Sequence, residues 1–150
     1  MKRFAFRLER LLQLRELAEQ EQARVLAVAM REEEARRAEL RESEAHLAAA
    51  REQYGMTPRE LSQAGTLQNL ELAISALIDQ TNTIGRAHET SLERVEQERH
   101  EFDKARMARR VIERLREHRQ ESWSSEVSRF EQNQVDETAI QRIQARPGGG

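Results

Sequence analysis

The chain has 150 residues, of which 35% are charged and only 4% aromatic, and its mean hydropathy is −0.87. This composition supplies too little apolar material for a thick globular core, and it is typical of long helices and coiled coils. Basic and acidic residues nearly balance, 25 against 27, which argues against a dedicated nucleic-acid binder. The absence of cysteine excludes disulfides and thiolate metal sites. We expect a soluble, cytoplasmic protein, because no stretch is apolar enough for a membrane span or a secretory signal.

The first predicted element is a helix over about residues 3–54. A row spaced by seven residues runs through it: Leu12, Glu19, Leu26, Glu33, Leu40, Leu47 and Tyr54. A second row supports it only in the first half: Phe4, Leu11, Ala18 and Val25. Polar residues at seam positions cost stability but can fix the register of pairing. We therefore predict a loose, easily bent helix pair.

A bend is predicted over about residues 55–66. Gly55 suits the end of a helix because glycine adopts a left-handed backbone conformation readily. The run from Thr57 to Glu60 has the order of a capping box, with Pro58 at the first helical position. It predicts a short helix over 58–64. Two interpretations remain open for Gly65-Thr66, which is either a second joint before the long helix or only a weak point in it.

The second long helix is predicted over about residues 67–143, followed by a frayed tail over 144–150. Stepping by seven gives Leu67, Ile74, Thr81, His88, Val95, Phe102, Arg109, Arg116, Trp123 and Phe130. The positions three residues on give Leu70, Leu77, Ile84, Ser91, Glu98, Ala105, Ile112, Arg119 and Glu126. A seven-residue pattern of this length, without proline, predicts a continuous coiled-coil helix. At about 1.5 Å per residue, its 67–130 portion would be roughly 95 Å long.

A short link between two long amphipathic helices predicts an all-α fold. The expected architecture is one domain over 1–150, a long antiparallel two-helix coiled-coil hairpin with unequal arms. Counting back from the bend places Phe4 opposite about residues 108–118. The second helix would then continue without a partner, carrying Trp123, Val127, Phe130, Val135 and Ile140.

No catalytic or metal-binding pattern is present in the sequence. His88 opens a stretch that begins like a zinc-protease His-Glu-x-x-His motif, but Leu92 occupies the position of the second histidine. We interpret His88 as a polar residue in the seam. The sequence predicts a protein that is not an enzyme and that binds no cofactor, metal or small-molecule substrate.

A basic cluster over residues 109–119 contains five arginines and two glutamates. Two interpretations remain open. The cluster is either a solvated helix face or a docking strip for an acidic partner next to Trp123.

Taken in order, these features resemble the FliJ family, the small coiled-coil component of the bacterial flagellar type III export apparatus. The opening from Phe4 to Glu16 is similar to the usual start of the family. The C-terminal part resembles its most typical segment in Glu117-His118-Arg119, Trp123, Glu126, Arg129, Glu131-Gln132 and Asp136-Glu137. The resemblance covers essentially the whole chain.

The resemblance implies a nonenzymatic coiled coil similar to the central stalk of rotary ATPases, with a role in flagellum biogenesis and cell motility. Its implied partners are the hexameric flagellar export ATPase, the cytoplasmic domain of the export gate membrane protein, and export chaperones that it would recycle. Its implied location is the cytoplasm, peripherally at the inner-membrane export apparatus. The alternatives are the stalk of a virulence type III secretion system and a generic coiled-coil scaffold that dimerises through the unpaired arm.

The resemblance also implies two sets of contact residues. The set for the ATPase is Phe4, Leu8, Leu11, Arg110, Arg114, Arg119, Trp123, Arg129 and Phe130. The set for the export gate is Leu47, Tyr54, Leu70, Ile74 and Leu77. The same spacing includes Ser43, Ala50 and Thr81, which are smaller or more polar than that role favours. For all eight residues of the gate surface, packing in the hairpin seam is the alternative.

Overall fold

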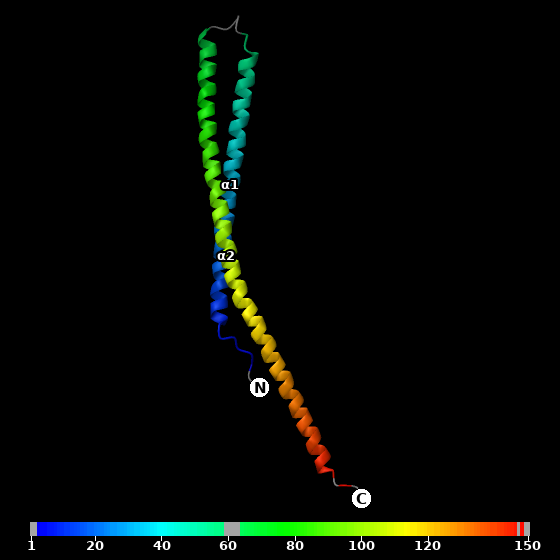
Figure 1. Cartoon of the computed structure of the whole chain (residues 1–150). Helices are drawn as coiled ribbons and strands as arrows, with labels where there is room; N and C mark the ends of the chain where they lie inside the picture. The colour runs from blue at the N-terminus through cyan, green and yellow to red at the C-terminus, as the bar shows by residue number, and fades with distance from the viewer. Residues whose placement is uncertain (1–2, 59–63, 147, 149–150) are drawn as a thin grey trace. The chain divides into compact units, whose positions relative to one another are not determined.

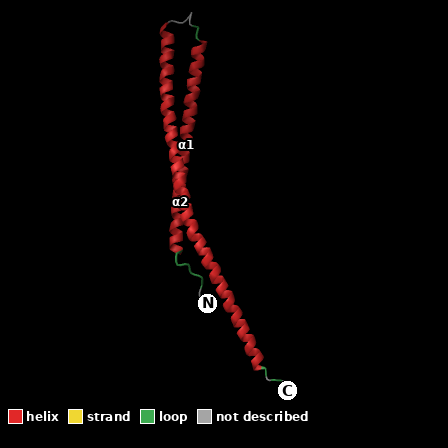
Figure 2. Ribbon diagram, in the orientation of Figure 1, coloured by secondary structure: helices red, strands yellow, loops and turns green. Residues whose placement is uncertain are grey.

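Two long helices make up most of the chain. The structure is a computed structural model that describes residues 3–58, 64–146 and 148. Helix α1 spans Glu9–Met56 and helix α2 spans Ala64–Ala145, with 48 and 82 residues. The described residues form no strand (Figure 2). The predicted all-α class and the unequal arms are therefore confirmed.

The chain divides into two units, which are described separately below. Unit 1 consists of Met1–Ala18 and Ala105–Gly150, and unit 2 consists of Glu19–Lys104. Within unit 2, the α1 and α2 segments run antiparallel and side by side (Figure 1). Unit 2 is thus the antiparallel helical hairpin that the sequence predicts.

The seven-residue pattern marks the seam of unit 2 correctly. Both predicted rows of α2 are half-buried from Leu67 to Phe102, and the α1 row from Leu26 to Tyr54 is half-buried or buried. The second predicted row of α1 is wrong in part, because Ala18 is exposed. Val25 of that row is half-buried. Further inward residues lie three positions after the first row, at Gln22, Ala29, Ser43 and Ala50, whereas Arg36 at the same spacing is exposed. A coiled-coil seam alternates steps of three and four residues. The second predicted row of α1 lies one residue before the first row, which does not fit this alternation.

Polar seam residues of unit 2 are paired across the helices. The Gln22 amide donates a hydrogen bond to the Glu98 carboxylate at 2.6 Å, and the Ser43 and Thr81 hydroxyls are 2.7 Å apart. Among the described residues, no buried side-chain nitrogen or oxygen lacks a hydrogen-bond partner. Pairing avoids the desolvation penalty that buried polar groups would otherwise carry.

His88 lies in the seam, as predicted, and contacts one buried carboxylate. Its Nε2 atom is 3.0 Å from Oε1 of Glu33, whose side chain is only 8% exposed. The Arg37 guanidinium donates to both Glu33 oxygens at 2.6 and 2.7 Å. The hydrogen bond from His88, followed by that from Arg37, lowers the pKa of Glu33 below its ordinary value. Glu33 is therefore held as a carboxylate between two cationic partners when His88 is protonated.

The end of α1 differs from the predicted bend. Gly55 lies inside the helix, and no described glycine has a positive φ. The Thr57 hydroxyl donates to the Gln53 carbonyl at 2.8 Å, so Thr57 closes the end of α1. Pro58 explains why the helix ends there, because proline disfavours helical geometry in the residue before it. Glu60 and most of the predicted 58–64 helix lie outside the described residues, and Gly65 is a helical residue of α2 rather than a joint.

The start of α1 also differs, because the helix begins at Glu9 rather than near residue 3. Arg3–Phe6 are not helical, and Arg7 and Leu8 form a turn in which the Glu9 amide donates to the Phe6 carbonyl at 3.1 Å. Glu9 suits a first turn because its charge opposes the positive end of the helix dipole. Within the described parts of α1 and α2, no segment is apolar and long enough to cross a bilayer.

We predict that Glu33 makes the stability of unit 2 depend on pH. Because its pKa is lowered in the folded state, its contribution is present above the unfolded-state value, near 4.5, and is lost as the pH falls through the folded value. Glu33→Gln should therefore unfold at a lower temperature than wild type at neutral pH, and the difference should shrink in acid. Circular dichroism melts measure this. The exposed Glu34→Gln is the matched control, and a Glu33→Gln deficit that is independent of pH would contradict the prediction.

Leu12 offers a second test, because its side chain is only 2% exposed. Leu12→Ala should lower the free energy of unfolding by about 2–3 kcal/mol through lost burial and an incompletely filled cavity. Leu14→Ala, at a position 55% exposed two residues further on, should have a much smaller effect. Denaturant titrations of the two variants measure the difference, and equal losses would show that Leu12 is not a core residue.

Candidate functional site

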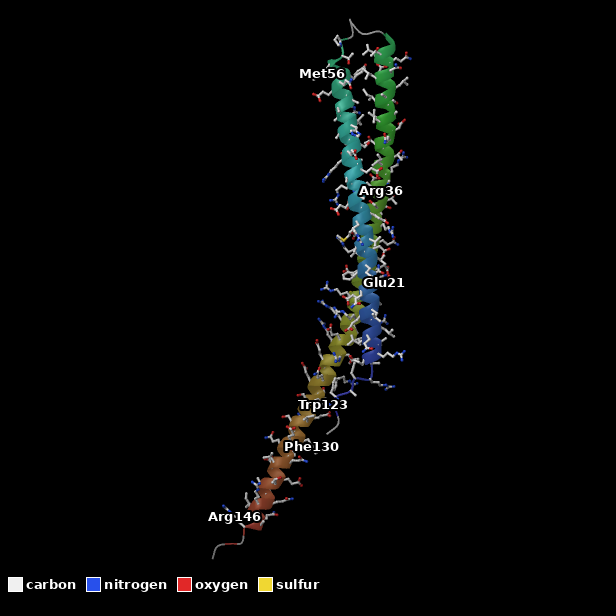
Figure 3. The ribbon with its side chains drawn as sticks, turned by 180° about the vertical axis from the view of Figure 1, so that it is seen from behind. Glu21, Arg36, Met56, Trp123, Phe130 and Arg146 are labelled. Atoms are coloured by element: carbon white, nitrogen blue, oxygen red, sulfur yellow. The ribbon has the colours of Figure 1, made fainter. Side chains whose placement is uncertain are left out.

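The N-terminal strap, residues Arg3–Leu8, packs on α2 within unit 1. The Phe4 ring lies against the Trp123 ring, with centroids 5.8 Å apart and planes tilted by 51°. Figure 3 shows Trp123 beside this segment and Phe130 further along α2. Trp123 is therefore half-buried, and the prediction that it belongs to a solitary arm is wrong.

The same contact corrects the predicted position of Phe4 opposite residues 108–118. That count assumed a helical rise of about 1.5 Å per residue, whereas extended backbone advances about 3.3 Å. Because the strap is not helical, it reaches further along α2 than a helix of the same length would.

The strap and one face of α2 form the two sides of a cleft that is open to solvent. Leu115, Arg119, Trp123 and Glu126 are separated by steps of four, four and three residues, which places them on one helix face. Phe4 and Leu8 of the strap line the opposite side, and the cleft volume is about 750 Å³. The floor is therefore apolar and partly aromatic.

Arginines dominate the charge of the cleft. Arg3, Arg7 and Arg119 line it, together with a single carboxylate from Glu126. Just outside the cleft, Glu9 of α1 pairs with Arg116 of α2 at 3.0 Å. This ion pair joins the first turn of α1 to α2 immediately beside the strap.

The structure brings together four of the nine residues predicted to contact an ATPase. Phe4, Leu8, Arg119 and Trp123 all line the cleft. The remaining five lie outside it: Leu11 is half-buried, Arg110, Arg114 and Arg129 are exposed, and Phe130 is 50% exposed. The exposed arginines are thus distributed around α2 rather than gathered at one point.

Several cleft residues were not among the predicted contacts. Arg3, Phe6 and Arg7 come from the strap, and Leu115, Ser122 and Glu126 come from α2. Helical spacing from Trp123 would have found Leu115 and Glu126. The strap residues could not be found that way, because the sequence predicted helix where the strap is not helical.

The predicted gate-contact residues lie in the seam of unit 2. Leu47, Leu70, Ile74 and Leu77 are half-buried, and the half-buried Tyr54 donates its hydroxyl to the Glu71 carboxylate at 2.8 Å. These positions therefore pack between the helices, and their role as gate contacts stays a prediction. Among the described residues near the link, two large apolar side chains that the sequence did not single out are exposed, Met56 at 73% and Leu72 at 63%.

The described residues contain no group of histidines and carboxylates arranged to hold a metal ion. In a comparison with known families, the model described as "Flagellar FliJ protein" matches residues 4–148. No curated protein and no solved structure matches the chain. The matched range includes Phe4 of the strap and the entire described length of α2.

Because Trp123 is the only tryptophan, its fluorescence reports directly on the strap. Phe4→Ala should shift the emission to longer wavelength and increase quenching by iodide, because it removes the ring that covers Trp123. Phe130→Ala removes an equivalent ring further along α2 and should leave the emission nearly unchanged. An unchanged spectrum in Phe4→Ala would mean that the strap does not cover Trp123 in solution.

Proposed function

Because this chain belongs to the FliJ family of flagellar proteins, we propose that it is a nonenzymatic central stalk and adaptor of the flagellar type III export apparatus. It inserts unit 1 into the hexameric export ATPase, promotes assembly and turnover of the hexamer, and links it to the export gate. Membership of the family itself implies a coiled-coil protein related to flagellar export. The roles at the ATPase and at the gate are our proposal.

The observation that carries the proposal is the construction of unit 1. Two segments distant in sequence, the strap and α2, meet there in one aromatic and arginine-rich surface. Buried aromatic residues and arginines are the residue types that dominate binding energy at protein interfaces. A surface of this kind suits a protein partner, and all the residues that form it except Arg3 lie within the matched range.

Contacts of unit 1 with the ATPase would have two parts. Trp123 and Phe130 supply aromatic anchors, of which Phe130 is already 50% exposed. Arg110, Arg114, Arg119 and Arg129 supply exposed guanidinium groups, which pair with carboxylates in a bidentate manner. Phe4, Leu8 and Leu11 hold the strap and the start of α1 against α2.

Contacts with the cytoplasmic domain of the export gate would involve unit 2 near the link. Leu47, Tyr54, Leu70, Ile74 and Leu77 are half-buried there, so each presents only part of its side chain to a partner. We propose that the exposed Met56 and Leu72 extend this surface. Recycling of export chaperones belongs to the same adaptor role, at the cytoplasmic side of the inner membrane.

The matched family favours a flagellar apparatus over a virulence secretion system, because its description names the flagellum. A generic scaffold that dimerises through α2 would use the exposed apolar residues Val135, Ile140 and Ile143. Sedimentation separates that alternative from the stalk, which acts as a single copy.

The purified chain should raise the turnover and oligomerisation of its cognate export ATPase. Trp123→Ala should weaken binding by about 30-fold, the effect of losing a hot-spot residue worth about 2 kcal/mol. A truncation after Arg119 should abolish the stimulation. Calorimetry and ATPase assays measure these effects, with circular dichroism to confirm that each variant is helical.

Val135→Ala is the matched control, because Val135 is 67% exposed on α2 and outside the proposed contact set. It should bind as the wild type does. A folded, monomeric wild-type chain with no effect on the ATPase would refute the stalk role.

A further inference from the structure

Positive charge is concentrated around the cleft of unit 1. Residues 3–15 contain four arginines and one glutamate, and residues 105–119 contain six arginines and two glutamates. Two of these three glutamates are already neutralised, Glu9 by Arg116 and Glu113 by Arg109. In these two stretches the eight other arginines are balanced by Glu117 alone, although the whole chain carries a net charge of −2.

The arginines that line the cleft are available to a ligand. Arg3, Arg7 and Arg119 are exposed and form no ion pair with another described residue. They surround an apolar floor made by Phe4, Trp123 and Leu115. A ligand that fits must therefore offer both carboxylates and an apolar side chain.

We propose that this cleft binds an acidic peptide segment of a partner protein, with one apolar side chain against the Phe4–Trp123 pair and flanking carboxylates on Arg3, Arg7 and Arg119. This inference rests on the proposed function, since the partner that would supply the acidic segment is the export ATPase. Arginine favours such ligands because its guanidinium matches a carboxylate in a bidentate geometry.

The cleft also has a direction. Glu126 follows Trp123 by almost one helical turn, whereas Arg119 precedes it by slightly more than one turn. Carboxylates of the ligand are attracted toward Arg119 and repelled near Glu126. The bound segment therefore has its acidic residues at the Arg119 end and a neutral or basic residue at the Glu126 end.

The shape and charge favour a peptide over other anions. An open cleft does not enclose a small molecule as ligand pockets do. Nucleic acid requires a continuous basic stripe, and Glu126 interrupts this one. A membrane-surface helix requires an apolar face separate from its charged face, but Arg119 and Glu126 share one face of α2 with Trp123.

The test uses the full chain and the fluorescence of Trp123. The probe is a blocked synthetic peptide in which a single leucine has glutamates on one side and glutamines on the other, and its partner peptide has glutamine in place of every glutamate. The acidic peptide should change the emission in a saturable, salt-sensitive manner, and the glutamine peptide should not. Arg119→Gln should weaken binding by about tenfold, as expected for loss of a charged hydrogen bond.

Arg106→Gln is the matched control, because it removes the same charge from an exposed position of α2 outside the cleft. It should weaken binding by less than about twofold, through general attraction alone. Equal weakening by the two variants, no saturable signal, or tighter binding of duplex DNA or phosphatidylglycerol vesicles would overturn the proposal.

Binding of the ATPase separates this inference from the proposed function. If the wild-type chain and Arg119→Gln bind the ATPase equally, the acidic-segment proposal fails while the stalk role stands. If the chain binds the acidic peptide but not the ATPase, the stalk role fails and the cleft assignment stands.

Discussion

Two helices share a single seam, and most of the apolar contact that holds each unit together has to be made along it. Among the described residues, only Leu12 and Ala29 are apolar and almost fully buried. Such a thin core cannot specify one register by burial alone, since many offsets would bury similar amounts. The polar pairs of unit 2 favour the observed register, because shifting one helix along the other would separate Glu33 from His88 and Ser43 from Thr81.

Much of the fold could be predicted from spacing, because a seven-residue period directly records which side chains face a partner helix. Leu67, Ile74 and Val95 are half-buried for this reason. Spacing could not locate the helix ends, which depend on local contacts. Gly55 remained helical because Pro58, not the glycine, ends α1, and α1 starts at Glu9 because the preceding residues pack on α2 instead. The pairing of His88 with Glu33 was also beyond the sequence, which placed both in the seam without assigning either a partner.

For the candidate site, too, the sequence indicated some of the residues but not their arrangement. Phe4, Leu8, Arg119 and Trp123 were selected through resemblance to a family, and they do line one cleft. Their mutual arrangement was not predictable, because the conformation of the strap decides which part of α2 it reaches. The predicted gate-contact positions pose a different problem. A half-buried leucine in a two-helix seam packs against the other helix whether or not a partner also contacts its exposed side. Periodicity alone cannot separate these two uses.

The polar pairs of unit 2 also imply an order of folding. The residues that they join are separated by 17 positions for Tyr54 and Glu71, 38 for Ser43 and Thr81, 55 for Glu33 and His88, and 76 for Gln22 and Glu98. Closing the longest of these loops first would cost about 1.3 kcal/mol more entropy than closing the shortest. Once the pair nearest the link has formed, each later pair closes only a short additional stretch. The two helices of unit 2 should therefore pair first near the link and then progressively away from it. Folding kinetics of substitutions at Tyr54 and Gln22 would show whether the contacts of Tyr54 form earlier in folding than those of Gln22.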